Sequence, residues 1–404
     1  MSTSLLYHGF GVRGYRYLKT EHTAGAMTLH LEQPRETCRC SACGSADVVF
    51  RGATERRIRT LPLGRKPVWF ALSIPRVACR ACQVVRQVKV GLAETRLSYS
   101  KPFARYALEL SRHMTIKDVA LHLGISWDVI KEIQKTDLQR RFAKPQLKHL
   151  RQIAIDEISV GSGHRYLTIV LDLESGAVVY VGEGKDAAAL EPFWKRLRAS
   201  RAKIAAVATD MSPAYIAAVM DHLPNATHVF DRFHVIKLFN DKLSNFRREL
   251  QRELTDKLHK DVLKGTRWLL LKRSEHLDPS RDEPRRLEEA LRLNQPLATV
   301  YYLKELLGEV WEQDDREAGE RFLKDWLQQA ETSGIRMLHD FAKTLRLYAW
   351  GILAYYDYPI STGPLEGTNN KIKTMKRQAY GFRDQEFFKL KIYALHQSKY
   401  ALVG

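Results

Sequence analysis

The middle of the chain alternates between strand-like and helix-like hydrophobic patterns, and this alternation constrains the fold more than any other feature of the sequence. Strand-like runs lie at 151–160, 164–176 and 177–184, then come a helix at 186–200, a strand at 203–210, a helix at 212–223 and a strand at 226–231. Alternating or short continuous apolar runs predict strands, and a 3.6-residue period predicts helices. We therefore expect one α/β domain with the order β-β-β-α-β-α-β.

This order is that of an RNase H-like domain, and it brings two acidic residues together. In such a sheet Asp156 stands on the first strand and Asp210 at the end of the fourth, so we expect them to be neighbours although 54 positions separate them. Adjacent carboxylates repel each other, and divalent cations relieve that repulsion. A structural role for either residue, capping the turn after its strand, is the alternative.

A third carboxylate, Glu366, follows a turn in the segment 361–382. Three convergent carboxylates suit two Mg²⁺ ions, or Mn²⁺ in their place, because these metals prefer hard oxygen ligands. In a basic chain they indicate phosphodiester chemistry on nucleic acid. No spacing rule selects Glu366 over other acidic residues, so Glu331 and Glu386 are the alternatives.

The formal net charge of +19 is concentrated at the two ends of the chain. Residues 1–150 hold 26 Lys and Arg against 11 Asp and Glu, residues 151–360 hold 31 against 32, and residues 361–404 hold 8 against 3. A polyanion bound by both ends would explain this pattern through phosphate neutralisation and counterion release. A merely soluble basic surface is the alternative.

All five cysteines fall in one short segment of the N-terminal region. Four of them form two C-x-x-C knuckles, Cys40 with Cys43 and Cys79 with Cys82, which can place four thiolates on one tetrahedral Zn²⁺. Cys38 is left over. The 35 residues between the knuckles predict two or three strands joined by a Pro/Gly turn. Four thiolates leave no open position, so we expect structural zinc, and disulfides are the alternative.

A helix-turn-helix spacing follows the cysteine region. Ala120 lets two helices approach, Gly124 permits the tight turn, and Ile130 holds the second helix against the first. Thr115 and Ser126 are expected N-caps. The second helix should run from about Trp127 to Lys135, and its exposed positions should face the major groove of DNA: Trp127, Asp128, Lys131 and Lys135. A generic pair of core helices is the alternative.

Two further basic segments are expected to hold DNA phosphates. They supply Arg140 and Arg141 from the linker 138–151, and Lys371, Lys373, Lys376 and Arg377 from one helix after Glu366. A solvated linker and a solvated basic helix face are the alternatives.

Residues 247–345 are rich in charged side chains and carry Leu, Trp and Tyr at helical spacing, which predicts an all-α insertion between Asp210 and Glu366. We expect its tryptophans to belong to a core rather than to a base-stacking platform: Trp268, Trp311 and Trp326.

Taken together, the zinc knuckles, the helix-turn-helix and the segments AIDEIS, ATDMSPAY, FDRFHVIKLFN and GPLEGTNNKIKTMKRQAYGF resemble the ISL-three family of bacterial insertion-sequence transposases. The resemblance covers nearly the whole chain. It implies a DDE transposase whose RNase H-like core is interrupted by an α-helical insertion, with Asp156, Asp210 and Glu366 as catalytic metal ligands. Asp231 and His234 resemble a D-x-x-H element of related Mutator-like transposases, in which the His lies near the scissile phosphate.

The expected reaction is metal-dependent cleavage of DNA at terminal inverted repeats, followed by transfer of the freed 3′-OH into target DNA. Double-stranded DNA is then the partner, and synapsis of two ends requires at least a homodimer. A structure-selective nuclease with the same core and a zinc and helix-turn-helix DNA-binding regulator are the rival functions.

We therefore expect a multidomain chain of α+β and α/β class. The expected parts are a zinc-binding domain at 1–95, a helix-turn-helix domain at 96–145, a catalytic core at 146–246 and 346–404, and a helical insertion at 247–345. The longest apolar runs fall far short of the roughly 18 residues of a membrane helix. The N-terminus lacks export features, so we expect a cytoplasmic, nucleoid-associated protein.

Overall fold

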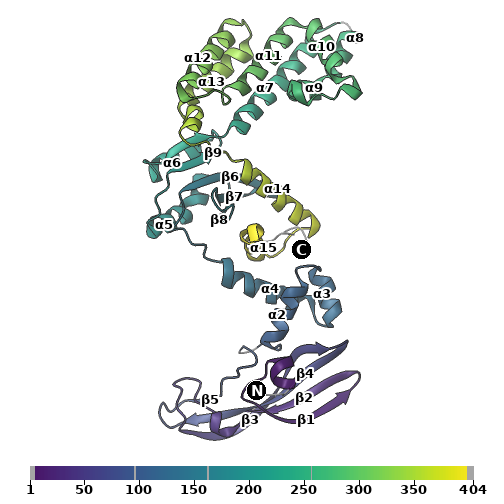
Figure 1. Cartoon of the computed structure of the whole chain (residues 1–404), viewed down its shortest axis with the longest axis vertical. Coiled ribbons are helices and arrows are strands. Elements are labelled where there is room, and N and C mark those ends of the chain that lie inside the picture. Colours follow the sequence, from purple (N-terminus) through teal and green to yellow (C-terminus); the bar gives the residue numbers. More distant parts are fainter. Residues whose placement is uncertain (1–4, 95–96, 162, 256, 398–404) are drawn as a thin grey trace. The chain divides into compact units, whose positions relative to one another are not determined.

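The computed structural model describes residues 5–94, 97–161, 163–255 and 257–397 (Figure 1). These residues fall into two compact units. The first unit comprises Met1–Ala143 and Met375–Leu390, and the second comprises Lys144–Thr374 and Lys391–Lys399.

The first unit begins with a short helix and a five-stranded sheet of order β1-β2-β4-β3, with β5 paired to β4. Its elements are α1 (Leu5–Phe10), β1 (Arg16–Thr23), β2 (Ala26–Glu32), η1 (Arg35–Thr37), β3 (Val48–Leu63), β4 (Lys66–Cys79) and β5 (Val85–Gln87). β2 and β4 pair in parallel, and the other pairs are antiparallel. The strands and the turn expected between the cysteine knuckles are confirmed as β3, β4 and the turn at Gly64, whose φ is +59°.

Burial alternates along β4 because one face of the sheet covers the hydrophobic core. Leu31, Ile58, Phe70 and Leu72 are almost completely buried there. β1 lies at the edge, and seven of its eight residues are exposed. The sheet therefore has a dry inner face and a solvated outer edge.

Three helices follow in the first unit: α2 (Lys101–Leu110), α3 (Ile116–Leu123) and α4 (Trp127–Phe142). Thr115 accepts a hydrogen bond from the backbone N–H of Asp118 at 3.2 Å, and Ser126 accepts one from Asp128 at 3.2 Å. Gly124 ends α3 in the left-handed conformation with φ of +61°. The N-caps and the turn predicted for the helix-turn-helix are therefore confirmed.

The second of these helices is longer than predicted. α4 does not end near Lys135 but continues to Phe142, so Arg140 and Arg141 stand on its last turn rather than in a linker. No Gly or Pro interrupts the sequence before Pro145, and the helix therefore continues until the chain approaches that residue.

The second unit contains a mixed sheet of order β10-β9-β6-β7-β8. Its strands are β6 (Gln152–Gly161), β7 (Arg165–Asp172), β8 (Val178–Glu183), β9 (Ala206–Thr209) and β10 (Thr227–Phe230). β6, β7 and β8 form an antiparallel meander, while β9 is parallel to β6 and β10 is parallel to β9. The predicted order of strands and helices is confirmed.

The helices between these strands are η2 (Ala187–Leu190), α5 (Glu191–Ser200) and α6 (Pro213–His222). Phe193 and Trp194 of α5 and Tyr215 of α6 are buried against Ile155 and Val170 of the sheet. Because strands β9 and β10 run parallel to β6, their carboxyl ends lie at the same edge of the sheet as the middle of β6. That edge carries the residues described below.

The remaining described elements after β10 are helical. They are α7 (Arg232–Glu253), α8 (Lys257–Gly265), α9 (Arg267–Leu271), η3 (Ser274–His276), η4 (Pro279–Arg281), α10 (Glu283–Leu293), α11 (Gln295–Glu309), α12 (Arg316–Thr332), α13 (Arg336–Leu353), η5 (Ala354–Tyr356), α14 (Gly363–Gln378), α15 (Gln385–Tyr393) and η6 (Leu395–Gln397). Within the described residues, no helix is long and apolar enough to cross a membrane.

The helices α7 to α13 share one hydrophobic core, and two of the three tryptophans lie in it as predicted. Trp311 and Trp326 are buried, and the Trp326 indole N–H donates to the carbonyl of Leu303 at 2.8 Å. The prediction for Trp268 is wrong, because its side chain is 65% exposed. The five-residue helix α9 buries Leu269 and its neighbour instead, which leaves Trp268 on the outer side.

Candidate functional site

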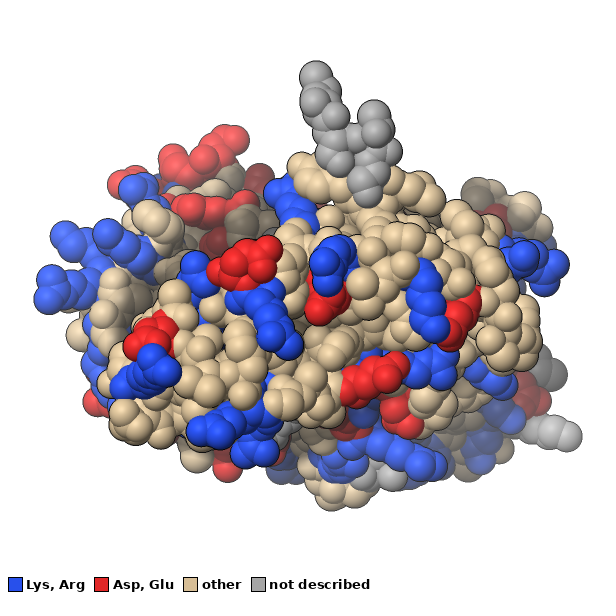
Figure 2. Space-filling view, turned by 90° about the horizontal axis from the view of Figure 1, so that it is seen from below, with Lys and Arg blue, Asp and Glu red and all other residues tan. Residues whose placement is uncertain are grey.

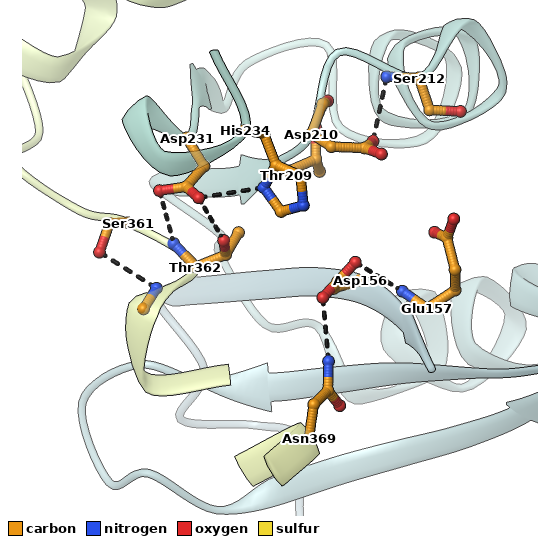
Figure 3. A network of polar contacts seen from close by, with 11 residues as sticks. Asp156, Glu157, Thr209, Asp210, Ser212, Asp231, His234, Ser361, Thr362 and Asn369 are labelled. Atoms are coloured by element: carbon orange, nitrogen blue, oxygen red, sulfur yellow. Dashed lines mark hydrogen bonds and ion pairs between the residues drawn. The ribbon is translucent and has the colours of Figure 1, made fainter. Parts of the chain in front are cut away.

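Asp156 lies on β6 in the second unit, and a residue from α14 contacts it directly (Figure 3). One carboxylate oxygen accepts a hydrogen bond from the Asn369 side-chain amide at 2.9 Å, and the other accepts from the backbone N–H of Glu157 at 2.8 Å. Burial raises the pKa of Asp156 to about 6, although the nearby His234 opposes this rise. The carboxylate is therefore poorly solvated and favours a cationic partner.

Asp210 follows the end of β9, on the same edge of the sheet. Its carboxylate accepts a hydrogen bond from the backbone N–H of Ser212 at 3.0 Å, so the turn-capping role considered from the sequence is present. The negative charge of Asp210 also contributes to the raised pKa of Asp156. The two residues therefore interact electrostatically, and a capping role leaves the second carboxylate oxygen of Asp210 available.

The sequence did not single out Glu157, which adds another carboxyl group to this edge. Burial and then the charge of Asp210 raise its pKa. Figure 3 shows Asp156, Glu157, Asp210 and His234 around one space. The only signal for Glu157 in the sequence is its place beside Asp156.

Asp231 and His234 form a buried pair at the start of α7. The Asp231 side chain is fully buried and accepts hydrogen bonds from His234 Nδ1 at 3.0 Å, from Thr362 Oγ1 at 2.6 Å and from the Thr362 backbone N–H at 3.3 Å. Both of its carboxylate oxygens are thus occupied by donors within the protein. Asp231 therefore fixes His234 and the residues that precede α14.

The electrostatics of this pair favour a charged imidazolium. Burial would raise the pKa of Asp231, but hydrogen bonds from His234 and Thr362 outweigh it and the pKa is lowered. The hydrogen bond to Asp231 raises the pKa of His234 against the effect of burial, and the charge of Asp156 adds to the rise. Because Nδ1 is held by Asp231, the other ring nitrogen is left to face the space beside Asp156 and Asp210 (Figure 3).

Glu366 stands in the first turn of α14 and is exposed. Its backbone N–H donates to the carbonyl of Thr362 at 2.8 Å, and it precedes Asn369 by one helical turn. Its carboxylate does not form a tight cluster with the other two in this structure. Among the described residues, one group of three or more Cys, His, Asp or Glu ligand atoms lies within 4.8 Å, and it consists of cysteines. The sequence alternatives both form ion pairs, Glu331 with Arg346 at 2.5 Å and Glu386 with Lys135 at 2.7 Å.

The four knuckle cysteines meet in the first unit with their sulfur atoms within 4.8 Å of one another. Cys40 and Cys82 are 3.6 Å apart, and Cys43 and Cys79 are 3.5 Å apart. Thiolates around one Zn²⁺, with Zn–S bonds of about 2.3 Å, stand about 3.8 Å apart. Backbone N–H groups of Cys43 and Ala42 lower the pKa of Cys40 to about 6. The cluster therefore fits structural zinc.

The two knuckles share one backbone geometry. The backbone N–H of Gly44 donates to the carbonyl of Cys40 at 2.9 Å, and that of Gln83 donates to the carbonyl of Cys79 at 3.0 Å. Both donor residues, Gly44 and Gln83, have a positive φ. Cys38 lies outside the cluster, because its buried thiol donates to the carbonyl of Pro34 at 3.6 Å instead. The cluster thus uses four of the five cysteines, as the spacing predicted.

Three residues of α4, the recognition helix, that were predicted to contact DNA differ in their exposure. Trp127 is 54% exposed at the start of α4. Lys131 and Lys135, however, contact Asp384 at 3.0 and 3.1 Å, and their side chains are 27% and 18% exposed. A hydrogen bond from the backbone N–H of Phe387 and the two lysines lower the pKa of Asp384 to about 2. DNA contact by these lysines stays a prediction, and here they bind a carboxylate of the first unit.

The other predicted DNA-binding residues differ in their pairing. Arg140 and Arg141 contact Asp137 within α4, at 2.5 and 3.5 Å. Along α14 the four basic side chains are exposed or half-buried and have no carboxylate partner among the described residues: Lys371, Lys373, Lys376 and Arg377. These side chains are available to phosphates.

The N-terminal sheet adds a basic groove that the sequence did not reveal. This groove, of about 640 Å³, is bordered by β3, β4 and β5 and lined by Arg56, Arg76, Arg86 and Lys89 among others. Figure 2 shows Lys and Arg side chains spread over one face of the molecule, with groups of Asp and Glu between them. No acidic residue is among the described residues that line the groove, so it suits a phosphate backbone.

Comparison with known families settles the class of the protein. Residues 153–392 match a family model described as a transposase. Residues 36–82 match the zinc-finger of transposase IS204/IS1001/IS1096/IS1165, and residues 88–136 match the helix-turn-helix domain of transposase family ISL3. The chain belongs to the ISL3 family of transposases. It is a DNA transposase with a structural zinc site and a DNA-binding helix-turn-helix.

Individual relatives of this ISL3 transposase cover nearly its whole length. The transposase for insertion sequence element IS1001 of Bordetella parapertussis is 32% identical over 96% of this chain and 95% of that protein. The transposase for insertion sequence element IS1557 of Mycobacterium tuberculosis is 28% identical over 90% and 87%. The Drosophila P element transposase strand transfer complex aligns with 66% of this chain and 81% of that chain at a TM-score of 0.34 and 11% identity, which is too low to show a shared fold.

Proposed function

We propose that this transposase cleaves the ends of its insertion sequence and joins them to target DNA with Asp156, Asp210 and Glu366 as the ligands of two Mg²⁺ or Mn²⁺ ions. The observation that carries the proposal is the grouping of Asp156 and Asp210 at one sheet edge beside His234. Two carboxylates next to an imidazole form a site for hard cations and a phosphate group.

The oxygen-bearing side chains at this edge of the sheet fit a divalent metal ion. The raised pKa values of Asp156 and Glu157 mark carboxyl groups that burial and mutual repulsion disfavour as anions, and a cation would relieve both. The side-chain oxygen of Asn369 is buried and has no partner among the described residues. Mg²⁺ held there would polarise the phosphate and lower the pKa of a bound water.

Glu366 is the best candidate for the third ligand because two contacts hold α14 against the sheet. Asn369 reaches Asp156, and Thr362, just before the helix, binds Asp231. Residues three positions apart share a helix face, so Glu366 lies on the side of α14 that carries Asn369. We infer that its carboxylate completes the set when metal and DNA bind.

His234 has the charge and direction to stabilise the reacting phosphate. Its Nδ1 is held by Asp231, and this hydrogen bond raises the pKa of the imidazole, which favours its charged form. A fixed cation beside a phosphate that gains negative charge lowers the barrier to cleavage. Asp231 acts through His234 as a positioning residue, because its own oxygens are occupied by His234 and Thr362.

We also propose that the second unit is an RNase H-like core whose all-α insertion lies between β10 and α14. The antiparallel meander followed by two parallel strands supports this reading, as do the helices α7 to α13 after β10. The helix-turn-helix, zinc domain and basic groove would bind terminal inverted repeats, since the relatives are named as insertion-sequence transposases. Synapsis of two ends implies at least a homodimer, and this substrate implies work at the bacterial nucleoid.

The test uses the full chain with a labelled duplex of the terminal repeat, a target duplex and Mg²⁺. Wild type should give cleaved and joined products, whereas Asp156→Asn should bind the duplex unchanged and lose about 10²-fold or more of the rate. Cleavage without joined products would indicate a nuclease. Unreduced activity of Asp210→Ala would contradict the ligand assignment.

The third ligand is tested with matched variants. Glu366→Gln should abolish cleavage, while Glu331→Gln and Glu386→Gln should retain it, because those carboxylates form ion pairs with Arg346 and Lys135. Loss of cleavage in either control together with retention in Glu366→Gln would reassign the ligand.

A further inference from the structure

Tyr380 ends α14 in an unusual way. The backbone N–H of Tyr380 donates to the backbone carbonyl of Arg377 at 3.1 Å, and the N–H of Gly381 donates to the backbone carbonyl of Lys376 at 2.9 Å. This pair of hydrogen bonds is the Schellman motif of a helix C-terminus, in which the first residue after the cap adopts the left-handed conformation and is usually glycine. Here that residue is Tyr380, with φ of +51°, and the glycine stands one position later.

The left-handed conformation of Tyr380 carries an energetic cost. In the left-handed region the Cβ atom crowds the following carbonyl oxygen, so a residue other than glycine is disfavoured. The Tyr380 side chain is 101% exposed, and no hydrogen bond or ring contact is found for it among the described residues. A single exposed aromatic is ordinary. An aromatic ring that is completely exposed on a residue with a positive φ is a candidate for contact with a ligand.

The turn that displays Tyr380 is firmly held on its C-terminal side. Asp384 accepts a hydrogen bond from the backbone N–H of Phe387 at 3.0 Å, and it also binds Lys131 and Lys135 of α4. The ring of Phe382 stacks on Phe388 with centroids 4.7 Å apart and planes at 22°. All of these residues belong to the first unit. The turn that carries the Tyr380 ring is therefore anchored to the rest of the first unit.

The surroundings of Tyr380 are cationic. Lys376, Arg377 and Arg383 flank it, and none has a carboxylate partner among the described residues. The acidic neighbours Asp384 and Glu386 are already paired with lysines of α4. Three basic residues within four positions of an exposed planar ring suit a nucleotide, whose base stacks while its phosphates are neutralised. The same charges would repel this patch on a second copy of the chain.

We propose that Tyr380 stacks on an unpaired nucleobase of the DNA substrate, with Lys376, Arg377 and Arg383 holding the adjacent phosphates. Within a duplex the faces of each base are covered by its neighbours, so the ring requires a base that is flipped out or lies at a cleaved or frayed end. The inference rests on the proposed function, because it takes the transposon DNA as the ligand.

The test compares two single-stranded probes of equal length, oligothymidylate and its abasic analogue, which keeps the phosphates and lacks the bases. Wild type should bind oligothymidylate about 5- to 150-fold more tightly than the abasic strand, the range for stacking of one base. Tyr380→Ala should lose this preference while its affinity for the abasic strand stays unchanged, and Tyr380→Trp should keep it. Binding is measured by fluorescence anisotropy on the full chain.

Controls separate stacking from charge and from folding. Tyr302→Ala removes a tyrosine that is 60% exposed on α11 and should change neither affinity. Arg377→Gln should weaken both probes equally. Tyr380→Gly should raise the melting temperature because it relieves the left-handed strain, yet it should lose the base preference. An unchanged preference in Tyr380→Ala, or a lower melting temperature for Tyr380→Gly, overturns the proposal.

The two proposals fail in different ways. If wild type neither binds nor cleaves terminal-repeat duplex, the proposed function is refuted. If wild type cleaves and joins while Tyr380→Ala keeps the full base preference, the stacking role alone is refuted.

Discussion

Removing the charge of Asp231 should lower the free energy of unfolding, by an amount that depends on pH. The buried carboxylate accepts from His234 and twice from Thr362, at 3.0, 2.6 and 3.3 Å. Each hydrogen bond to a charged group contributes about 1.5–3 kcal/mol. Asp231→Asn keeps the shape but loses the charge, so we expect the free energy of unfolding to fall by about 2–3 kcal/mol. Asp231→Ala also removes the acceptors and should cost about 3–5 kcal/mol.

The pH dependence follows from the two opposite pKa shifts. The pKa of Asp231 is below its ordinary 3.8, so its stabilisation is present above that pH and is lost as pH falls through the lower folded-state value. The pKa of His234 is above its ordinary 6.5, so its stabilisation is complete below pH 6.5 and is lost as pH rises through the higher folded-state value. The pair therefore stabilises the fold most between about pH 4 and 6.5.

Urea unfolding of wild type and Asp231→Asn across this range measures the effect. The difference between them should be largest near pH 6 and should shrink as pH rises past the pKa of His234. Thr362→Val is the matched control, because it removes one donor to Asp231 and leaves the charge in place. The two substitutions share a partner, so their costs should not add. A cost that is the same at pH 6 and pH 9, or that is below about 0.5 kcal/mol, would refute the reasoning.

Two further predictions concern the first unit. Cys79→Ser should release the zinc and lower the melting temperature of the chain. Cys38→Ser should leave the zinc content unchanged, because its thiol lies outside the cluster. Elemental analysis of the purified variants measures the zinc content. Arg76→Gln and Arg86→Gln in the basic groove should each reduce, by about 0.9, the slope of the logarithm of the DNA-binding constant against the logarithm of salt concentration. Arg336→Gln, at an exposed position on α13, is the control and should leave this slope unchanged. Anisotropy titrations at several salt concentrations measure the slope. An unaltered slope in both groove variants would show that the groove does not contact phosphates.

Local features of the fold were accessible from the sequence because neighbouring residues determine them. Gly124 and Ser126 predict a turn and a cap within a few positions, and the C-x-x-C spacing predicts the zinc cluster. The proximity of Asp156 and Asp210 followed from strand order, because parallel strands align their carboxyl ends. These inferences needed no knowledge of how distant segments pack.

The contacts that were missed join distant segments. Thr362 binds Asp231 across 131 positions, and Asn369 binds Asp156 across 213. No periodicity or motif specifies such a pair, because it depends on how α14 returns to the sheet. Glu157 was also missed, because its interaction with the charge of Asp210 depends on how β6 and β9 pair.

The ion pairs between α4 and Asp384 have a consequence for dissecting the protein. The lysines of the recognition helix are partly neutralised by a residue encoded 249 positions after Lys135. A fragment that ends before Asp384 therefore presents a more positive helix than the full chain does. Such a fragment should bind any DNA more tightly at low salt, and it would overstate the affinity of the helix-turn-helix while understating its discrimination between sequences.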